Sequence, residues 1–140
     1  MPFDIKQECA GVDWSVVAEI LKTVGMAHHD PEVHQRAFEA SHTTVFVYQA
    51  EQLIGFGRAI SDGVYQAAVY DCAVLPDFQG QGVGRVIMKN ILTALPECNA
   101  ILYASPGKEG FYQKFGFRKM ITGMARFQKS GSMRARGFTE

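Results

Sequence analysis

A strand, a turn and a helix follow one another in residues 71–92, which read DCAVLPDFQGQGVGRVIMKNIL. Apolar residues precede Pro76, and glycines at positions 80, 82 and 84 precede apolar residues at helical spacing. The first N–H groups of a helix have no intrahelical partner, so a bare backbone at this point can receive an anion. The pattern predicts a nucleotide site, a phosphate site or simply a tight turn.

The glycines can be compared with three known patterns. A Walker A loop ends in Gly-Lys-Ser/Thr, whereas Gly84 is followed by Arg85 and Val86, so this interpretation fails. A dinucleotide-binding loop reads GxGxxG, whereas this loop reads GxGxG and follows a meander of strands. A plain turn with positive φ needs one glycine, and three at alternate positions exceed that need. The sequence favours close contact between this backbone and a ligand.

Composition narrows the class of protein. The chain has 140 residues, of which 47% are hydrophobic and 20% are charged, as expected for one globular domain. Lys and Arg equal Asp and Glu at 14 each, so no overall field favours nucleic acid or an anionic membrane. Three cysteines without CxxC spacing and an N-terminus without a signal-peptide pattern predict a cytoplasmic protein. No apolar run is long enough to span a membrane.

Periodicity predicts an α+β fold with a mixed sheet covered by helices. The expected strands are residues 3–8, 43–49, 52–60, 66–75, 100–104 and 123–128, and the expected helices are residues 14–24, 31–39, 84–95 and 110–115. Their order is β-α-α-β-β-β-α-β-α-β. The apolar strand 100–104 is expected to be buried on both faces. Residues 1–128 are expected to form a single domain, and the polar residues 129–140 a flexible tail.

Two motifs carry a resemblance to a known family. Residues 74–92 resemble motif A of the GCN5-related N-acetyltransferase (GNAT) superfamily, whose Q/R-x-x-G-x-G/A signature is carried here by Gln79, Gly82 and Gly84. Residues 111–117, FYQKFGF, resemble the end of motif B of that superfamily. The order of elements matches the superfamily fold over essentially the whole chain. The resemblance implies an acetyl-coenzyme A-dependent N-acetyltransferase in which a bound primary amine attacks the thioester directly.

The resemblance also implies how this cosubstrate is held. Backbone N–H groups at the start of the helix would contact its pyrophosphate, with side-chain donors from Gln79 and Arg85. Main-chain groups of residues 72–75 would bind the pantetheine arm, the N–H near Val74 would polarise the thioester carbonyl, and residues 100–105 would form the other lip. The implied cofactor-binding residues are Cys72, Ala73, Val74, Leu75, Gln79, Gly80, Gln81, Gly82, Val83, Gly84, Arg85, Ser105 and Tyr112.

Tyr112 is the first catalytic candidate, since it occupies the motif position where many members place a tyrosine near the coenzyme sulfur. It would stabilise the leaving thiolate by a hydrogen bond. The alternative is that Tyr112 packs as a core residue beside Phe111, Phe115 and Phe117.

Asp71 is the second catalytic candidate, because an ammonium acceptor must lose a proton before it attacks. Its carboxylate would orient water or hold the ammonium form. The alternative, a buried structural carboxylate, is equally open. Asp62 is a further option, although Asp62-Gly63 is more typical of a turn.

Other polar residues carry weaker hypotheses. Cys72 lacks a visible base partner, which speaks against a cysteine-acyl intermediate. The spacing in HHDPEVH, residues 28–34, matches no metal site well, so no metal is expected. Trp14, His28, His29 and Phe38 are candidates for an acceptor pocket or are merely structural. Arg58 is expected to be a solvent-facing charge in preference to an acceptor contact.

The expected partner is a small-molecule amine, with neither nucleic acid nor membrane. A protein lysine or N-terminal acetyltransferase is the nearest alternative, and a non-catalytic coenzyme A-binding regulatory domain is the alternative from another class. A homodimer is possible through an exposed edge at strand 123–128.

Overall fold

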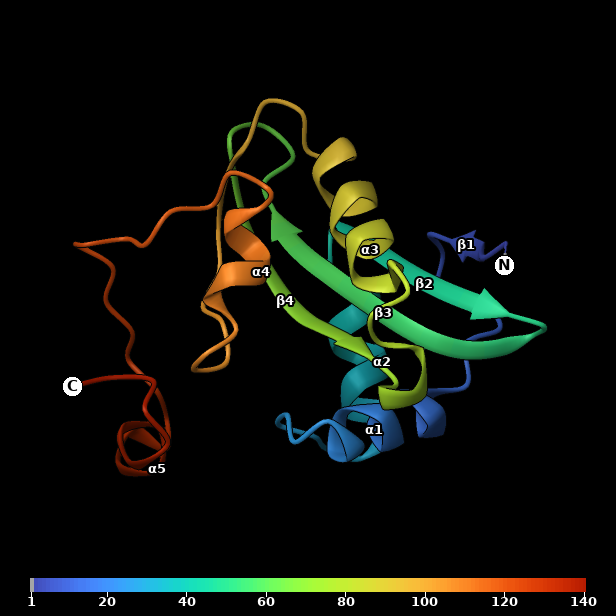
Figure 1. The fold of residues 1–140 in the computed structure, drawn as a ribbon, viewed down its shortest axis with the longest axis horizontal. Coiled ribbons are helices and arrows are strands. Elements are labelled where there is room, and N and C mark those ends of the chain that lie inside the picture. Colours follow the sequence, from blue (N-terminus) through green and yellow to red (C-terminus); the bar gives the residue numbers. More distant parts are fainter. Residues whose placement is uncertain (1) are drawn as a thin grey trace. The chain divides into compact units, whose positions relative to one another are not determined.

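The computed structural model describes residues 2–140, which form two compact units that meet in sequence between Leu102 and Tyr103 (Figure 1). The first unit contains strands β1 Asp4–Lys6, β2 Thr43–Gln49, β3 Gln52–Ser61, β4 Gln66–Val74 and β5 Asn99–Ile101, and helices α1 Trp14–Thr23, α2 Pro31–Glu39, η1 Pro76–Phe78 and α3 Val83–Thr93. The sheet order is β1-β2-β3-β4-β5. Strands β1 to β4 are antiparallel and β5 is parallel to β4, so the predicted mixed sheet is confirmed.

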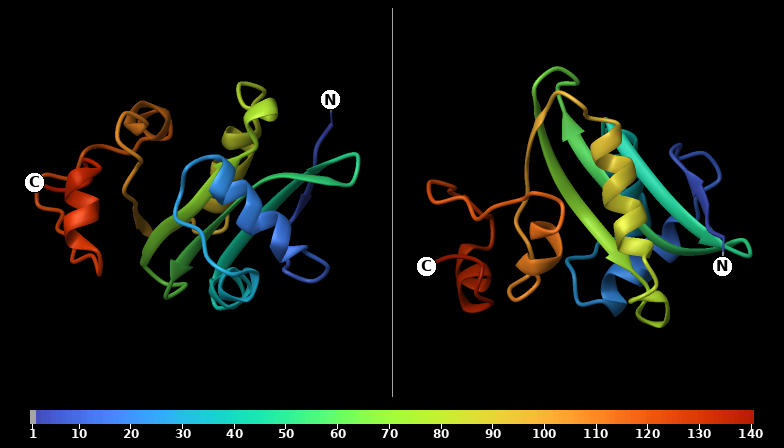
Figure 2. Two further views of the ribbon diagram at one scale, coloured as in Figure 1. Left: turned by 90° about the horizontal axis from the view of Figure 1, so that it is seen from below. Right: turned by 45° about the horizontal axis from the view of Figure 1, so that its top comes forward.

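Helices α1 and α2 lie on one face of this sheet and α3 lies on the other (Figure 2). Asp13 caps α1 as predicted, because its carboxylate accepts from the N–H of Ser15 at 3.1 Å. On the α1 and α2 face, aromatic rings form the core: Phe38 lies 5.5 Å from Trp14 and 5.6 Å from Phe46 between ring centroids. Trp14 is 9% exposed and Phe38 is fully buried, which favours the structural one of the two roles left open for these residues.

Helix α3 approaches β3 closely because β3 has glycines on the facing side. A Cβ on Gly57 would lie 2.8 Å from Cγ2 of Ile87 and 2.9 Å from Sγ of Cys72. A Cβ on Gly55 would lie 3.0 Å from Cγ1 of Val83. These two glycines set the distance between helix and sheet, and thereby the position at which the N-terminus of α3 follows the end of β4.

The second unit contains two short helices, α4 Glu109–Gln113 and α5 Ser130–Ala135. Helix α5 lies within residues 129–140, the segment that the sequence analysis expected to be a polar tail. Gly137 has φ of +87° and ends α5, with the N–H of Phe138 donating to the carbonyl of Met133 at 3.0 Å. The Phe138 ring packs against Tyr103 at 5.9 Å between centroids. A helix cap and an aromatic contact therefore order this segment.

Two strand predictions in the C-terminal half are wrong. Residues 123–128 form no strand, and among residues 2–140 no segment pairs with them. Strand β5 covers only Asn99–Ile101 and Ile101 is 50% exposed, so the strand is not buried on both faces. Both errors have one cause: a strand is stabilised by its neighbours, and β5 has only β4, over three residue pairs. No helix among the described residues is long and apolar enough to cross a membrane.

Candidate active site

A β-bulge interrupts β4 three residues before its end. Phe56 of β3 pairs with Ala73, but Arg58 pairs with Tyr70, so two residues of β4 face the single residue Gly57. The first of these two, Asp71, has φ of +55°. The bulge lies where the sequence predicted both the catalytic carboxylate and the strand that receives the pantetheine arm.

The carboxylate of Asp71 forms an ion pair. The Nε of Arg58 donates to Oδ2 of Asp71 at 2.7 Å, and the two side chains are 15% and 24% exposed. The guanidinium also lies 5.6 Å from the ring centroid of Phe38 and 5.4 Å from that of Tyr70. Arg58 is therefore not a solvent-facing charge, and that expectation is corrected. Its side chain lies on the face of the sheet covered by α1 and α2, where a buried charge is tolerable only if it has a partner.

Cys72 follows Asp71 on the other face of the sheet. Its sulfur packs beside Gly57, and burial, reinforced by the charge of Asp71, raises the pKa of Cys72 to about 12. The thiol therefore stays protonated near neutral pH, and a thiolate is the nucleophile in cysteine catalysis. The geometry argues against a cysteine-acyl intermediate, in agreement with the sequence analysis.

The end of β4 has main-chain groups that β5 does not use, because β5 pairs only with Gln66, Ala67 and Ala68. The N–H of Leu75 donates to the carbonyl of Ile54 in β3 at 2.8 Å, and the carbonyl of Leu75 accepts from Phe78 at 2.9 Å. Successive N–H groups of a strand point to opposite sides in the plane of the sheet, so the N–H of Val74 points away from β3. The N–H of Val74 is thus directed toward the side of β4 that β5 leaves unpaired beyond Ala68.

The glycine loop leads into α3 with left-handed backbone. Gly80 has φ of +78° and Gly82, the N-cap of α3, has φ of +87°. A Cβ added to either would meet no atom within 4 Å, so the space beside both is open. Glycine suits these two positions for two reasons: it adopts positive φ readily, and its lack of a side chain leaves room for a ligand beside the backbone.

Side chains brace the same loop from within. The Nε2 of Gln79 donates to the carbonyl of Val74 at 2.9 Å, and the Nε2 of Gln81 donates to the carbonyl of Asp77 at 3.1 Å. Gln79 therefore ties the loop to the end of β4. Val83 anchors the first turn of α3 in the core with 1% of its surface exposed, while Arg85 extends into solvent.

Tyr112 and Ser105 both belong to the second unit. Tyr112 lies in α4, with its ring 5.1 Å from that of Phe111 and 6.2 Å from that of Phe117 between centroids. Ser105 is exposed, and its carbonyl accepts from the N–H of Lys108 at 2.9 Å. The aromatic packing predicted around Tyr112 is present, and its hydroxyl chemistry stays a prediction.

Asp62 is a turn residue. Its Oδ1 accepts from the N–H groups of Val64, Tyr65 and Gln66 at 2.7, 2.9 and 3.2 Å. These bonds stabilise the ionised form and lower the pKa of Asp62. The carboxylate is occupied in shaping the β3–β4 turn.

His34 is a buried polar residue that the sequence analysis assigned no role. It is 3% exposed, and its Nε2 accepts from the backbone N–H of His29 at 2.8 Å. Burial lowers the pKa of His34, while the charge of Asp71 acts in the opposite direction. His28 and His29 are exposed. Within residues 2–140, no three side chains of His, Cys, Asp or Glu are grouped to hold a metal ion.

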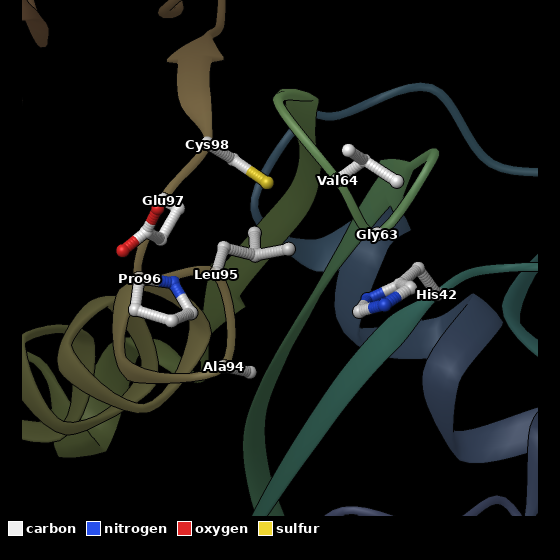
Figure 3. Close-up of a pocket in the computed structure, with 8 residues that line it drawn as sticks. All are labelled: His42, Gly63, Val64, Ala94, Leu95, Pro96, Glu97 and Cys98. Carbon is white, nitrogen blue, oxygen red and sulfur yellow. The ribbon is translucent and has the colours of Figure 1, made fainter.

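Two hollows in the first unit lie apart from the bulge. One of about 300 Å³ adjoins the C-terminal end of α3, opposite the glycine loop, with His42 and Cys98 on facing walls (Figure 3). The other, of about 730 Å³, lies between α1 and the β2–β3 hairpin and reaches the end of β4 only at Leu75. The bulge and the glycine loop, with open space and unpaired main chain, remain the better candidate site.

Comparison with known proteins bears on the family and the fold of the chain. The family described as "Acetyltransferase (GNAT) domain" matches residues 9–133. The chain is 34% identical over 133 residues to serotonin N-acetyltransferase 2, chloroplastic, of Oryza sativa subsp. japonica, covering 88% of this chain. A probable acetyltransferase of unknown function, SA2161 of meticillin-resistant Staphylococcus aureus, aligns with a TM-score of 0.80 at 25% identity, covering 91% of this chain and 99% of that chain.

A second solved structure agrees with the first. The GNAT family acetyltransferase SP0256 of Streptococcus pneumoniae TIGR4 aligns with a TM-score of 0.77 at 26% identity, covering 91% of this chain and 99% of that chain. The curated relatives are longer: this chain spans 66% of the rice protein, and 64% and 60% of two uncharacterised ycf52 N-acetyltransferases, from Porphyra purpurea and Gracilaria tenuistipitata var. liui.

Proposed function

The chain belongs to the acetyltransferase (GNAT) family, and from that premise we propose that it transfers an acetyl group from acetyl-coenzyme A to the primary amine of a small molecule. The observation that carries the proposal is the glycine loop: two left-handed glycines with open space beside them precede α3, next to the unpaired end of β4. An anion is favoured at such a helix N-terminus by the orphan N–H groups and by the helix dipole.

In this proposal the pyrophosphate of acetyl-coenzyme A contacts the backbone of residues 79–84. Gly80 and Gly82 leave room for it, and Gln79 holds the loop through its bond to Val74. Arg85, exposed in the first turn of α3, adds a cationic donor. The pantetheine arm occupies the side of β4 that β5 leaves unpaired.

The acyl group then lies at the N–H of Val74. A backbone donor fixed in a sheet stabilises negative charge on the thioester oxygen without reorganising, which is the usual role of an oxyanion hole. The incoming amine attacks the carbonyl carbon, and the thiolate of coenzyme A leaves. Tyr112 is proposed to donate a hydrogen bond to that thiolate, since full proton transfer from an ordinary phenol would be uphill by roughly 2 kcal/mol.

The acceptor must lose a proton before it attacks. An amine with pKa near 10.4 is neutral in only roughly one molecule in 10³ to 10⁴ at pH 7, so the site must promote deprotonation. The rice relative is named for serotonin, an arylalkylamine, as its substrate, which supports an amine of this class here. Protein lysine or N-terminal acetylation is the alternative, and coenzyme A binding without turnover is the third possibility.

Calorimetry with acetyl-coenzyme A and a free-thiol release assay test the proposal. The acceptor panel contains serotonin, spermidine, glucosamine and a lysine peptide. Turnover with a small amine supports the proposal, turnover with the peptide alone supports the protein acetyltransferase, and tight binding without any turnover supports the regulatory domain. Failure to take up acetyl-coenzyme A would contradict all three.

Gly82→Ala tests the loop itself. Gly82 has φ of +87°, so alanine strains the backbone by about 1 kcal/mol and places a methyl group in the open space beside the loop. We expect the affinity for acetyl-coenzyme A to fall at least about tenfold by calorimetry. The matched control is Gly25→Ala, which has φ of +79°, equally open surroundings and a place at the far end of α1. Equal effects of the two variants would refute the contact.

The proposal extends to the setting and assembly of the protein. All three cysteines are free, which supports a reducing compartment such as the cytoplasm. A homodimer is also proposed, although strand 123–128 is absent and cannot supply the edge. The support comes instead from Ile121 and Met124, each 98% exposed.

A further inference from the structure

Asp71 has a strained backbone conformation, with φ of +55°, although it does not lie in a turn. The other non-glycine residues with positive φ, within residues 2–140, are Ala50 and Glu51, which form the two-residue β2–β3 turn where left-handed backbone matches the strand twist. Asp71 lies within β4. An L-residue in this conformation costs about 1–2 kcal/mol, although Asp tolerates it better than most residues do. Such strain persists only when the surroundings compensate for it.

Arg58 provides the compensation. Its Nε donates to Oδ2 of Asp71 at 2.7 Å, and its Nη1 donates to Oγ of Ser41 at 3.2 Å. The hydroxyl of Ser41 in turn donates to the carbonyl of Ala37 in α2 at 2.7 Å. The rings of Phe38 and Tyr70 flank the guanidinium, so its position is fixed from several sides. A carboxylate held in this way is anchored to both β3 and α2.

The bulge decides which N–H groups β3 uses. The carbonyl of Ile54 accepts from Leu75 because the extra residue in β4 has moved the register. If the pairing of Arg58 with Tyr70 continued without a bulge, Val74 would lie opposite Ile54 and its N–H would be consumed by β3. A slip of one residue reverses the direction of every later group in a strand. The bulge is therefore what turns the N–H of Val74 toward the unpaired side of β4.

We infer that Asp71 and Arg58 are positioning residues: their ion pair holds the left-handed bulge that aims the N–H of Val74 at the acyl carbonyl, and Asp71 takes no proton from the acceptor. The inference rests on the proposed function. It also resolves the two alternatives for Asp71 in favour of the structural one. One carboxylate oxygen is already bonded to Arg58, and the pair as a whole carries no net charge with which to attract an ammonium group.

Three substitutions at Asp71 separate conformation from proton transfer, because all remove the carboxylate but differ in tolerance of positive φ. Asn and Gly adopt φ near +55° readily, whereas Ala does not. We expect Asp71→Asn and Asp71→Gly, which lose the ion pair but tolerate positive φ, to lose about threefold in acetyl-coenzyme A affinity and in kcat, and Asp71→Ala, which also strains the bulge, to lose about tenfold in each. A general base would instead make all three variants lose about 10²-fold or more in kcat alike.

A pair of variants at Arg58 tests the same idea from the other partner. Arg58→Met leaves the Asp71 carboxylate half-buried without a cation and should weaken acetyl-coenzyme A binding by about tenfold. Adding Asp71→Gly removes that carboxylate and relaxes the bulge. The double variant should therefore recover most of the affinity that Arg58→Met loses. If Asp71 were the base, the double variant would be at least as inactive as either single variant.

The control series is Glu51→Asn, Glu51→Gly and Glu51→Ala, since Glu51 has φ of +68° in the hairpin turn. Glu51→Asn and Glu51→Gly should be more thermally stable than Glu51→Ala, and all three should keep the kcat and the affinity of the wild type. The readouts are calorimetry with acetyl-coenzyme A, thiol release with serotonin, and the pH profile of kcat/KM, whose acidic limb should persist in Asp71→Asn. A wild type that binds no acetyl-coenzyme A would contradict the proposed function. A wild type that binds it, with equal affinities or equal losses of kcat across the three Asp71 variants, would overturn this inference alone.

Discussion

In this protein, single side chains fix the conformation of loops that have no regular secondary structure. His34 is an example: its buried Nε2 accepts from the N–H of His29 and so fixes the loop between α1 and α2. The tautomer follows from this bond, since an imidazole nitrogen that accepts carries no proton and the proton must be on Nδ1. The side chain is therefore neutral in the folded state, which makes stability dependent on pH.

The pH dependence has a definite sign. Burial lowers the pKa of His34 in the folded protein below the value of about 6.5 expected for the unfolded chain. The unfolded state then binds more protons, so the contribution is complete above pH 6.5 and is lost as pH falls from there through the lowered folded pKa. We expect His34→Gln to lose about 1 kcal/mol in the free energy of unfolding at pH 7.5, and this difference to shrink toward pH 5.

Urea unfolding at several pH values measures this effect. His28→Gln is the control, because it removes an exposed imidazole from the same loop. A difference between His34→Gln and the wild type that stayed constant from pH 7.5 to pH 5 would contradict the buried neutral imidazole.

Among the elements, the contact between α3 and β3 depends on Gly57. A methyl group there would lie 2.8 Å from Ile87, which is 1% exposed, and 2.9 Å from Cys72, which is half-buried. We expect Gly57→Ala to lower the free energy of unfolding by about 1–3 kcal/mol through overpacking. Thermal or urea unfolding measures the loss. Gly110→Ala, where a Cβ meets nothing within 4 Å, is the control and should cost much less. A neutral Gly57→Ala variant would show that α3 can move outward freely.

The elements of the first unit were predictable because their signals are local. β-Branched and aromatic residues in a hairpin pattern identified β2 and β3, Asp13 and Pro31 marked helix starts, and the glycine run located the N-terminus of α3. The closing strand was not predictable in the same way, because its residues 123–128 have strand-like composition but no partner in the sheet. The local sequence indicates which secondary structures a segment can adopt, but a strand forms only where a neighbouring strand is available to pair with it.

The candidate site shows the same division. The glycine loop was found because only glycine adopts its backbone readily, so sequence and conformation are tied. The ion pair between Arg58 and Asp71 was missed, since it depends on two strands and a bulge. Nothing in DCAVL indicates positive φ at Asp71, whereas a glycine at that position would have. The roles of Asp71 and Tyr112 stay predictions for that reason.

At the scale of the whole molecule, apolar surface remains exposed in the second unit. Residues 118–126 are exposed throughout, and Met120, Ile121 and Met124 are 62%, 98% and 98% exposed. Their own unit therefore does not bury them. Scattered apolar side chains are ordinary on a surface, but a short segment with three large ones is typical of an interface. A second copy of the chain is the proposed partner.

Light scattering tests that dimer directly. At micromolar concentration the wild type should have twice the chain mass of 15.5 kDa. Ile121→Asp combined with Met124→Asp should give the monomer mass, because replacing two exposed apolar side chains by carboxylates removes the apolar contact and adds a desolvation cost that a modest interface does not offset. Thr122→Asp adds one charge to the same exposed segment and should leave the dimer intact. A wild type with the mass of a single chain would exclude the dimer, and a double variant that remained dimeric would place the interface elsewhere on the protein.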